Sequence, residues 1–229
     1  MKIVRILVVT STFLALVGSA PIALAAGGGG GGGSAEIGGS GGSGSRSSRT
    51  PAAIAKRHYQ AGIRHKEKAW KLEEKAAREE DPEDRAKLLG KADKAYAKAL
   101  EAQSAAVKAN PKDHASYNEL GYALRKSGQY AEAIEAYDRA LALDSTYFPA
   151  IEYRGEAYLA TGQLEKAKRA YMVLFRNERP LADQLMGAME AWLAKQPPDH
   201  VEAFAAWVEE RKALAAAGDD LSQNNTRTW

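Results

Sequence analysis

The chain has 229 residues, of which 45% are hydrophobic and 27% charged, a composition typical of a globular protein rather than a collagenous or wholly disordered one. It contains no cysteine, which excludes a disulfide framework, a cysteine-based metal site and a thiol nucleophile. The formal net charge of +3 comes from the first 50 residues, because residues 51–229 hold 28 basic and 28 acidic side chains. The net charge is therefore no argument for a nucleic acid partner.

Residues 1–26 have the three-part layout of a secretory signal peptide. A short basic start is followed by an apolar run over 6–17 and then by small residues before a cleavage point. A membrane anchor is the alternative, since the segment could just span a bilayer of about 30 Å. Because Pro21 interrupts the run, we expect cleavage after Ala25 or Ala26. The sequence predicts export, with a periplasmic location first and secretion or membrane tethering as alternatives.

Residues 27–50 form a Gly/Ser-rich segment that holds 12 of the 21 glycines. Such a segment has almost nothing to bury, so it is predicted to be a disordered linker with a span of about 25–30 Å. A glycine-rich phosphate cradle would need a preceding strand and a following helix, and neither is readable here.

Residues 51–111 are predicted to form a long helical hairpin that leads into the rest of the chain, with helices at about 51–79 and 82–109. Asp81 is the expected N-cap of the second helix, with Pro82 in its first turn. Whether 82–109 is one helix or two stays open at this stage, although its apolar spacing favours one. The residues expected on the buried stripes are Gly62, Ile63, Ala69, Trp70, Leu72, Ala76 and Ala77 in the first helix, and Leu89, Ala92, Tyr96, Ala99, Gln103 and Ala106 in the second.

An internal repeat with an offset of 34 residues relates 117–147 to 151–181. Glycine recurs in the middle of the first helix of each unit, where it costs about 1 kcal/mol relative to alanine and indicates close approach of a neighbour. It recurs again at the end of that helix, where a left-handed residue is expected. The matched pairs are Gly121 with Gly155, Gly128 with Gly162, Ala133 with Ala167, and Tyr137 with Tyr171.

The start Tyr117-x2-Leu120-Gly121-x2-Leu124 and the spacing of 34 residues resemble the tetratricopeptide (TPR) repeat, a helix–turn–helix unit. The resemblance implies an all-α fold, a TPR-type helical solenoid with two clear repeats at 112–147 and 148–181.

A helix pair at 182–217 is predicted to cap the repeats, and 218–229 to form a disordered tail. Asp199 and Glu202 resemble a capping box at the start of the last helix, which is expected to run to about Ala217. The residues expected to face one another are Leu185, Ala188, Met189 and Trp192 on one helix, and Val201, Ala205 and Val208 on the other.

The sequence contains no set of residues with the types and spacing of a known catalytic site. The four histidines are far apart, and no nucleophile elbow, P-loop or dinucleotide fingerprint occurs. We therefore expect a protein that is not an enzyme, with no catalytic residue, no cofactor and no bound metal.

The resemblance to TPR proteins implies a concave groove, lined by the first helices of successive pairs, that holds a peptide or a partner helix. The chain is then an exported adaptor or scaffold for a protein or peptide partner, with no nucleic acid and with membrane contact only if the N-terminal segment is uncleaved. The alternative is a membrane-tethered structural subunit of an envelope assembly that uses the long hairpin as its contact surface. The groove positions are Asn118, Tyr122, Arg125, Glu152, Tyr153, Glu156, Leu159, Met186 and Glu190.

Two groove carboxylates, Glu152 and Glu156, would repel a terminal carboxylate and favour a partner that carries Lys or Arg. On that hypothesis, replacing both with lysine abolishes partner capture and leaves the stability unchanged. The alternative is that the groove residues are ordinary solvated side chains.

Overall fold

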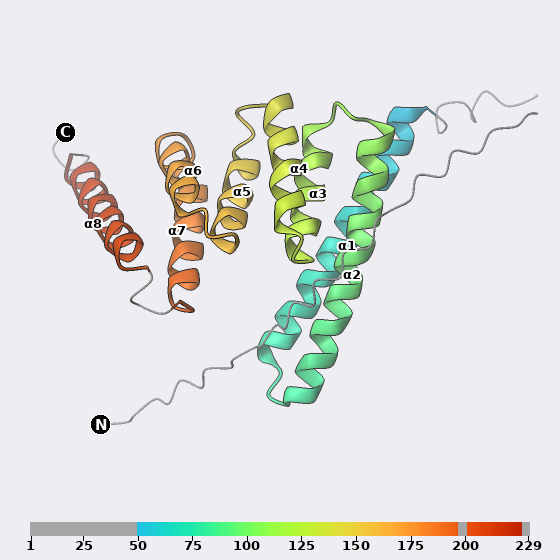
Figure 1. Cartoon of the computed structure of the whole chain (residues 1–229), viewed down its shortest axis with the longest axis horizontal. Helices are drawn as coiled ribbons and strands as arrows, with labels where there is room; N and C mark the ends of the chain where they lie inside the picture. Colours follow the sequence, from blue (N-terminus) through green and yellow to red (C-terminus); the bar gives the residue numbers. More distant parts are fainter. Residues whose placement is uncertain (1–49, 197–200, 226–229) are drawn as a thin grey trace, which may run out of the picture. The chain divides into compact units, whose positions relative to one another are not determined.

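The computed structural model describes residues 50–196 and 201–225, with side chains described up to residue 217. The predicted signal peptide, nearly all of the predicted linker and the end of the predicted tail lie outside these residues. The described residues form eight α-helices and no strand, which confirms the predicted all-α fold (Figure 1). The helices are α1 (Pro51–Arg78), α2 (Pro82–Ala109), α3 (His114–Lys126), α4 (Tyr130–Leu143), α5 (Phe148–Ala160), α6 (Leu164–Asn177), α7 (Arg179–Leu193) and α8 (Glu202–Asn225).

The two long helices begin at local signals that the sequence displays. The Thr50 side chain accepts a hydrogen bond from the amide of Ala53 at 3.2 Å, and Asp81 accepts from two amides of the next turn at 2.9 Å. A proline follows each cap, as expected where an amide has no partner in the helix. Residues 82–109 form one unbroken helix.

The interface between α1 and α2 is built from small residues, and this corrects part of the predicted stripes. Trp70 and Leu89 remain 42% and 44% exposed, although both were expected to be buried. Alanines let the two helix backbones approach closely, so Trp70 and Leu89 lie outside this contact. Ala77 is exposed too, and Ile63 is half-buried. The buried residues are Ala55, Gly62, Lys66, Ala69 and Ala76 in α1, and Ala92, Ala95, Tyr96, Ala99, Gln103 and Ala106 in α2.

Helices α3 to α6 form two successive pairs with the predicted repeat. Gly128 and Gly162 end the first helix of each pair at φ angles of 77° and 70°, the left-handed region in which glycine has no Cβ penalty. A Cβ atom at Gly121 would lie 2.6 Å from the ring of Tyr137, and one at Gly155 would lie 2.7 Å from Leu185. Both mid-helix glycines therefore mark close helix contacts, as predicted.

The last two helices pack through the predicted apolar residues. Leu185, Met189 and Val208 are fully buried, and the rings of Trp192 and Phe204 are 5.8 Å apart. The predicted cap residue Asp199 lies outside the described residues. Helix α8 continues to Asn225, past the predicted end at about Ala217, because a single glycine weakens a helix by about 1 kcal/mol without stopping it.

None of the described helices combines the length and the apolar character needed to cross a bilayer.

Candidate functional site

The nine predicted groove residues come from α3, α5 and α7, and α5 packs against each of the other two. Most of their side chains are withdrawn from solvent rather than open to a ligand. The exposed fractions are 1% for Asn118, 2% for Glu152, 3% for Leu159, and 7% for Tyr122 and Met186. Of the nine groove residues, only Glu190 is exposed, and it forms an ion pair with Lys212 of α8.

Arg125 joins α3 to α5 through a charged and an aromatic contact. Its guanidinium lies 2.5 Å from the carboxylate of Glu156, and it stacks over the rings of Tyr122 and Tyr153 at 5.2 and 5.4 Å. The two tyrosine rings themselves meet edge to face at 5.1 Å. Four predicted groove residues therefore bind one another.

A similar arrangement joins α1 to α3, and the sequence did not reveal it. The ammonium of Lys66 lies 2.5 Å from Glu119, with about 10% of either side chain exposed. The same ammonium is 4.9 Å from the Trp70 ring and 5.1 Å from the Tyr122 ring, and the Trp70 indole donates a hydrogen bond to the Tyr122 hydroxyl. The only sequence signal was the position of Lys66 between Gly62 and Ala69 on one helix face.

We call these contacts the cation–aromatic ladder. It consists of Lys66, Trp70, Glu119, Tyr122, Arg125, Tyr153 and Glu156. Cations over aromatic rings and buried ion pairs hold α1, α3 and α5 together across this face.

Glu152 corrects the predicted charge of the groove. Burial, and then the neighbouring carboxylate of Glu156, raise the pKa of Glu152 from 4.5 to about 9, so the side chain is neutral at pH 7. Its Oε2 atom has no hydrogen-bond partner. With Glu152 neutral and Glu156 paired with Arg125, the groove does not present the acidic surface expected from the sequence. Lysine at both positions would break this largely buried ion pair, so we now expect that variant to lose stability.

An open hollow of about 250 Å³ remains where the C-terminal ends of α3, α5 and α7 meet. Three predicted groove residues line it, Arg125, Glu156 and Leu159. Tyr130, Ala160, Ala191 and Lys195 were not predicted. Ala188 was expected to face α8, and Trp192 lines the hollow while it also contacts Phe204 of α8, the helix that it was predicted to face. The 3–4 spacing of 188, 191, 192 and 195 was the available signal. Apolar side chains line much of the hollow beside the charged groups, so it can take an apolar side chain of a partner. The lining residues are Arg125, Tyr130, Glu156, Leu159, Ala160, Ala188, Ala191, Trp192 and Lys195.

Within 50–196 and the described part of α8, no cluster of three or more histidine, aspartate or glutamate side chains could hold a metal ion. His114 lies 3.9 Å from Asp144 and 4.6 Å from the Tyr147 ring, so it belongs to the packing between the repeats. His200 lies outside the described residues.

A family model, the tetratricopeptide repeat, matches residues 114–147, which span α3, α4 and the turns around them. The match covers one repeat of the chain, so the chain contains a TPR repeat within an all-helical arrangement of TPR-like pairs. One similar solved structure is the first TPR of Spaghetti (RPAP3) bound to HSP90 peptide SRMEEVD, with 26% sequence identity and a TM-score of 0.38. The similarity covers 55% of this chain and 96% of that chain. No curated protein matches the chain.

Proposed function

We propose that the protein is an adaptor that captures a peptide or helix of a partner protein by an apolar side chain seated in the hollow between α3, α5 and α7. The observation that supports this most is the position of the hollow. It lies on the first helices of successive pairs, where the other predicted groove residues are mostly buried or paired with residues of the protein itself. The TPR match over 114–147 supports binding of a protein rather than catalysis.

The chemistry of the hollow defines the kind of partner. Leu159, Trp192 and three alanines provide the apolar contact area, which resembles the buried anchor pocket at the centre of a protein interface. The ion pair of Arg125 and Glu156 also lines the hollow but is satisfied within the protein, so it contributes orientation more than affinity. A leucine, methionine or phenylalanine at the centre of the partner segment fits this arrangement.

Export is the second part of the proposal, and it rests on residues 1–26. The basic start, the apolar run and the small residues before Ala26 support removal of this segment and a periplasmic location. N-terminal sequencing of the mature protein tests this directly. A chain that begins at Ala26 or Gly27 supports export with cleavage, whereas an intact Met1 together with partition into detergent supports the tethered alternative.

The hollow is tested by filling it. Ala160 and Ala191 are both exposed and line the hollow, so replacing both with tryptophan occupies the space without entering the core. We expect the double variant to lose at least about tenfold in affinity for partners that the parent protein captures from the native envelope. Ala77→Trp, an exposed alanine on α1 that does not line the hollow, is the matched control. Equal capture by all three proteins, with equal thermal unfolding, would remove the hollow from the proposal.

A further inference from the structure

Basic side chains gather on the outer face of the hairpin formed by α1 and α2. The helical hairpin, 51–109, holds 14 basic and 10 acidic residues, whereas 110–217 holds 13 basic and 16 acidic residues. Seven of the basic residues are exposed and line two adjoining hollows of about 430 and 240 Å³. We call this set the basic stripe, and it consists of Arg64, Lys68, Lys71 and Lys75 on α1, and Lys91, Lys94 and Lys98 on α2.

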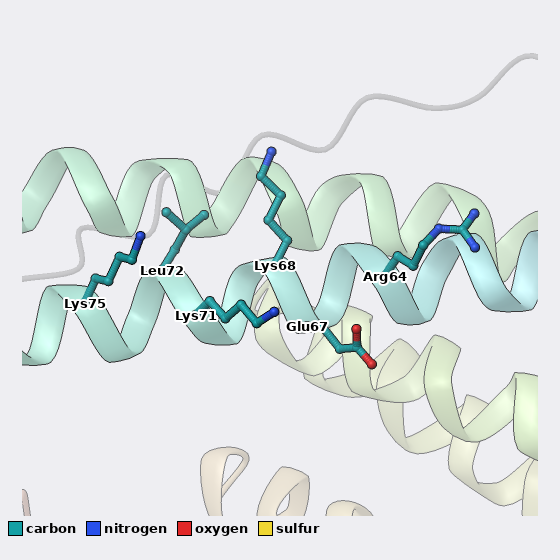
Figure 2. Close-up of a pocket in the computed structure, with 6 residues that line it drawn as sticks. All are labelled: Arg64, Glu67, Lys68, Lys71, Leu72 and Lys75. Atoms are coloured by element: carbon teal, nitrogen blue, oxygen red, sulfur yellow. The ribbon is translucent and has the colours of Figure 1, made fainter.

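Figure 2 shows the α1 members projecting from successive turns of the helix, with Lys68 and Leu72 reaching toward α2. Lys68 and Leu72 line both hollows, so the two hollows adjoin. Residues of α1 line the larger hollow, and residues of both helices line the smaller one, which we call the groove between α1 and α2. The α1 members extend over twelve residues, from Arg64 to Lys75, a length of about 17 Å.

The cations of the basic stripe form no direct ion pair within the described protein, although Glu67, Glu74 and Glu101 lie three or four positions from some of them. None of the seven side chains forms an ion pair or a hydrogen bond with another described residue, and Glu67 is the one described carboxylate that lines either hollow. The stripe instead contains like charges three or four residues apart, each pair costing about 0.2–0.5 kcal/mol in an isolated helix. Such a surface gains most from a partner that brings negative charge.

We propose that the basic stripe is a second docking surface, which binds an acidic segment of a partner protein along the groove between α1 and α2. Aspartate and glutamate side chains of that segment pair with the lysines on both sides, and an apolar side chain lies over Leu72. This surface is separate from the hollow between α3, α5 and α7, so the proposal does not depend on the proposed function.

The composition of the groove favours a polypeptide over other anionic partners. Among the described residues, the half-buried imidazole of His65 is the one aromatic ring that lines either hollow. No phenylalanine, tyrosine or tryptophan lines them, so nucleic acid bases meet no row of stacking rings and a bilayer meets no large inserting ring. Six of the seven cations are lysines, which lack the planar fork that arginine offers to phosphate groups. The walls of the groove are mainly aliphatic lysine stems around Leu72, and these suit side chains of mixed character.

The test uses the full chain and a fluorescent peptide of about a dozen residues with four glutamates and one leucine at helical spacing. We expect binding that weakens as salt is added, and that weakens at least about tenfold in a variant with Lys68, Lys71, Lys94 and Lys98 replaced by glutamine. The matched control replaces four exposed basic residues elsewhere with glutamine, so it loses the same charge and should bind within about twofold of the parent protein. The control positions are Lys108, Lys112, Arg139 and Arg176.

Further outcomes decide the proposal. A peptide with glutamine in place of glutamate should not bind, and one without the leucine should bind more weakly. Equal losses in the two quadruple variants would show that only net charge matters and would overturn the docking surface. Tighter binding of single-stranded DNA or of anionic vesicles than of the peptide would overturn the polypeptide partner. The variant with a filled hollow should bind the peptide normally, which separates this test from the preceding one.

Discussion

The cation–aromatic ladder and the basic stripe place cations of the same helix in opposite situations. Lys66 and Lys68 are two residues apart on α1, yet Lys66 is 8% exposed and paired with Glu119, whereas Lys68 is exposed and unpaired. One face of α1 therefore holds the fold together, and the other leaves its charge available to a partner. In this protein, a buried pair is a structural element and an unpaired exposed row is a candidate binding surface.

The largest expected effect comes from breaking the Lys66 pair. Lys66→Ala leaves the buried carboxylate of Glu119 without its partner, so we expect the free energy of unfolding to fall by about 3–5 kcal/mol. Urea unfolding followed by circular dichroism measures the change. Lys68→Ala is the matched control and should stay within about 0.5 kcal/mol of the parent protein. Similar losses in both variants would contradict the contrast between the two faces.

The next largest effect comes from replacing a glycine at a helix contact with alanine, compared with the same change at a glycine that faces open space. Gly121→Ala places a methyl group 2.6 Å from the Tyr137 ring, and we expect a loss of about 1–3 kcal/mol from overpacking. Gly90→Ala on α2 meets no atom within 4 Å, so it should gain about 0.5–1 kcal/mol from the better helix propensity of alanine. Thermal unfolding of the two variants should therefore shift in opposite directions. A gain in both would show that α3 and α4 are not closely packed at this point.

Glu152 predicts a dependence of stability on pH. Its pKa is raised in the folded protein, so between pH 4.5 and about 9 the folded protein retains a proton that the unfolded chain loses, and stability declines as pH rises through this window. Glu152→Gln removes this decline, because glutamine stays neutral. We expect the variant to gain at least about 1.4 kcal/mol over the parent protein between pH 5 and pH 8, the value of one unit of pKa shift. Denaturant unfolding across that range measures it, and parallel pH profiles would contradict a buried neutral carboxyl group.

The smallest effect concerns the self-repulsion of the basic stripe. Lys94→Gln removes repulsion from Lys91 and Lys98, so we expect a gain of about 0.2–0.5 kcal/mol for each pair at low salt and little gain at high salt. Lys108→Gln, on the same helix, has no charged residue of that helix three or four positions away, so it should show no such salt dependence. A salt-independent gain at position 94 would point to helix propensity instead of charge.

The sequence predicted the helices well where the signals are local. The bounds of α1 and α2 were placed within about one residue, because Asp81 and the two prolines act within a single turn of backbone. The repeat was readable because Gly128 and Gly162 recur 34 residues apart at positions that need a left-handed conformation. The end of α8 was predicted too early, at about Ala217 instead of Asn225, since Gly218 is compatible with either a turn or a continued helix.

The sequence predicted which helices carry the candidate site, but not which side chains on them are open to a partner. Of the nine groove residues, Arg125, Glu156 and Leu159 line the open hollow, and most of the others are buried. Exposure at a groove position depends on which side chains the neighbouring helices bring against it. Repeat spacing alone does not specify those neighbours.

By itself, the sequence determined the all-helical class, the two repeats and the residues at which the described chain turns, because capping and backbone conformation act between residues close in the chain. Only the tertiary structure decided the state of the charges. Lys66 and Glu119 read as ordinary exposed residues until α1 and α3 pack together, and Glu152 reads as an acid until burial makes its ionised form unfavourable. Desolvation and ion pairing arise from residues distant in the chain, so they appear only when the helices meet.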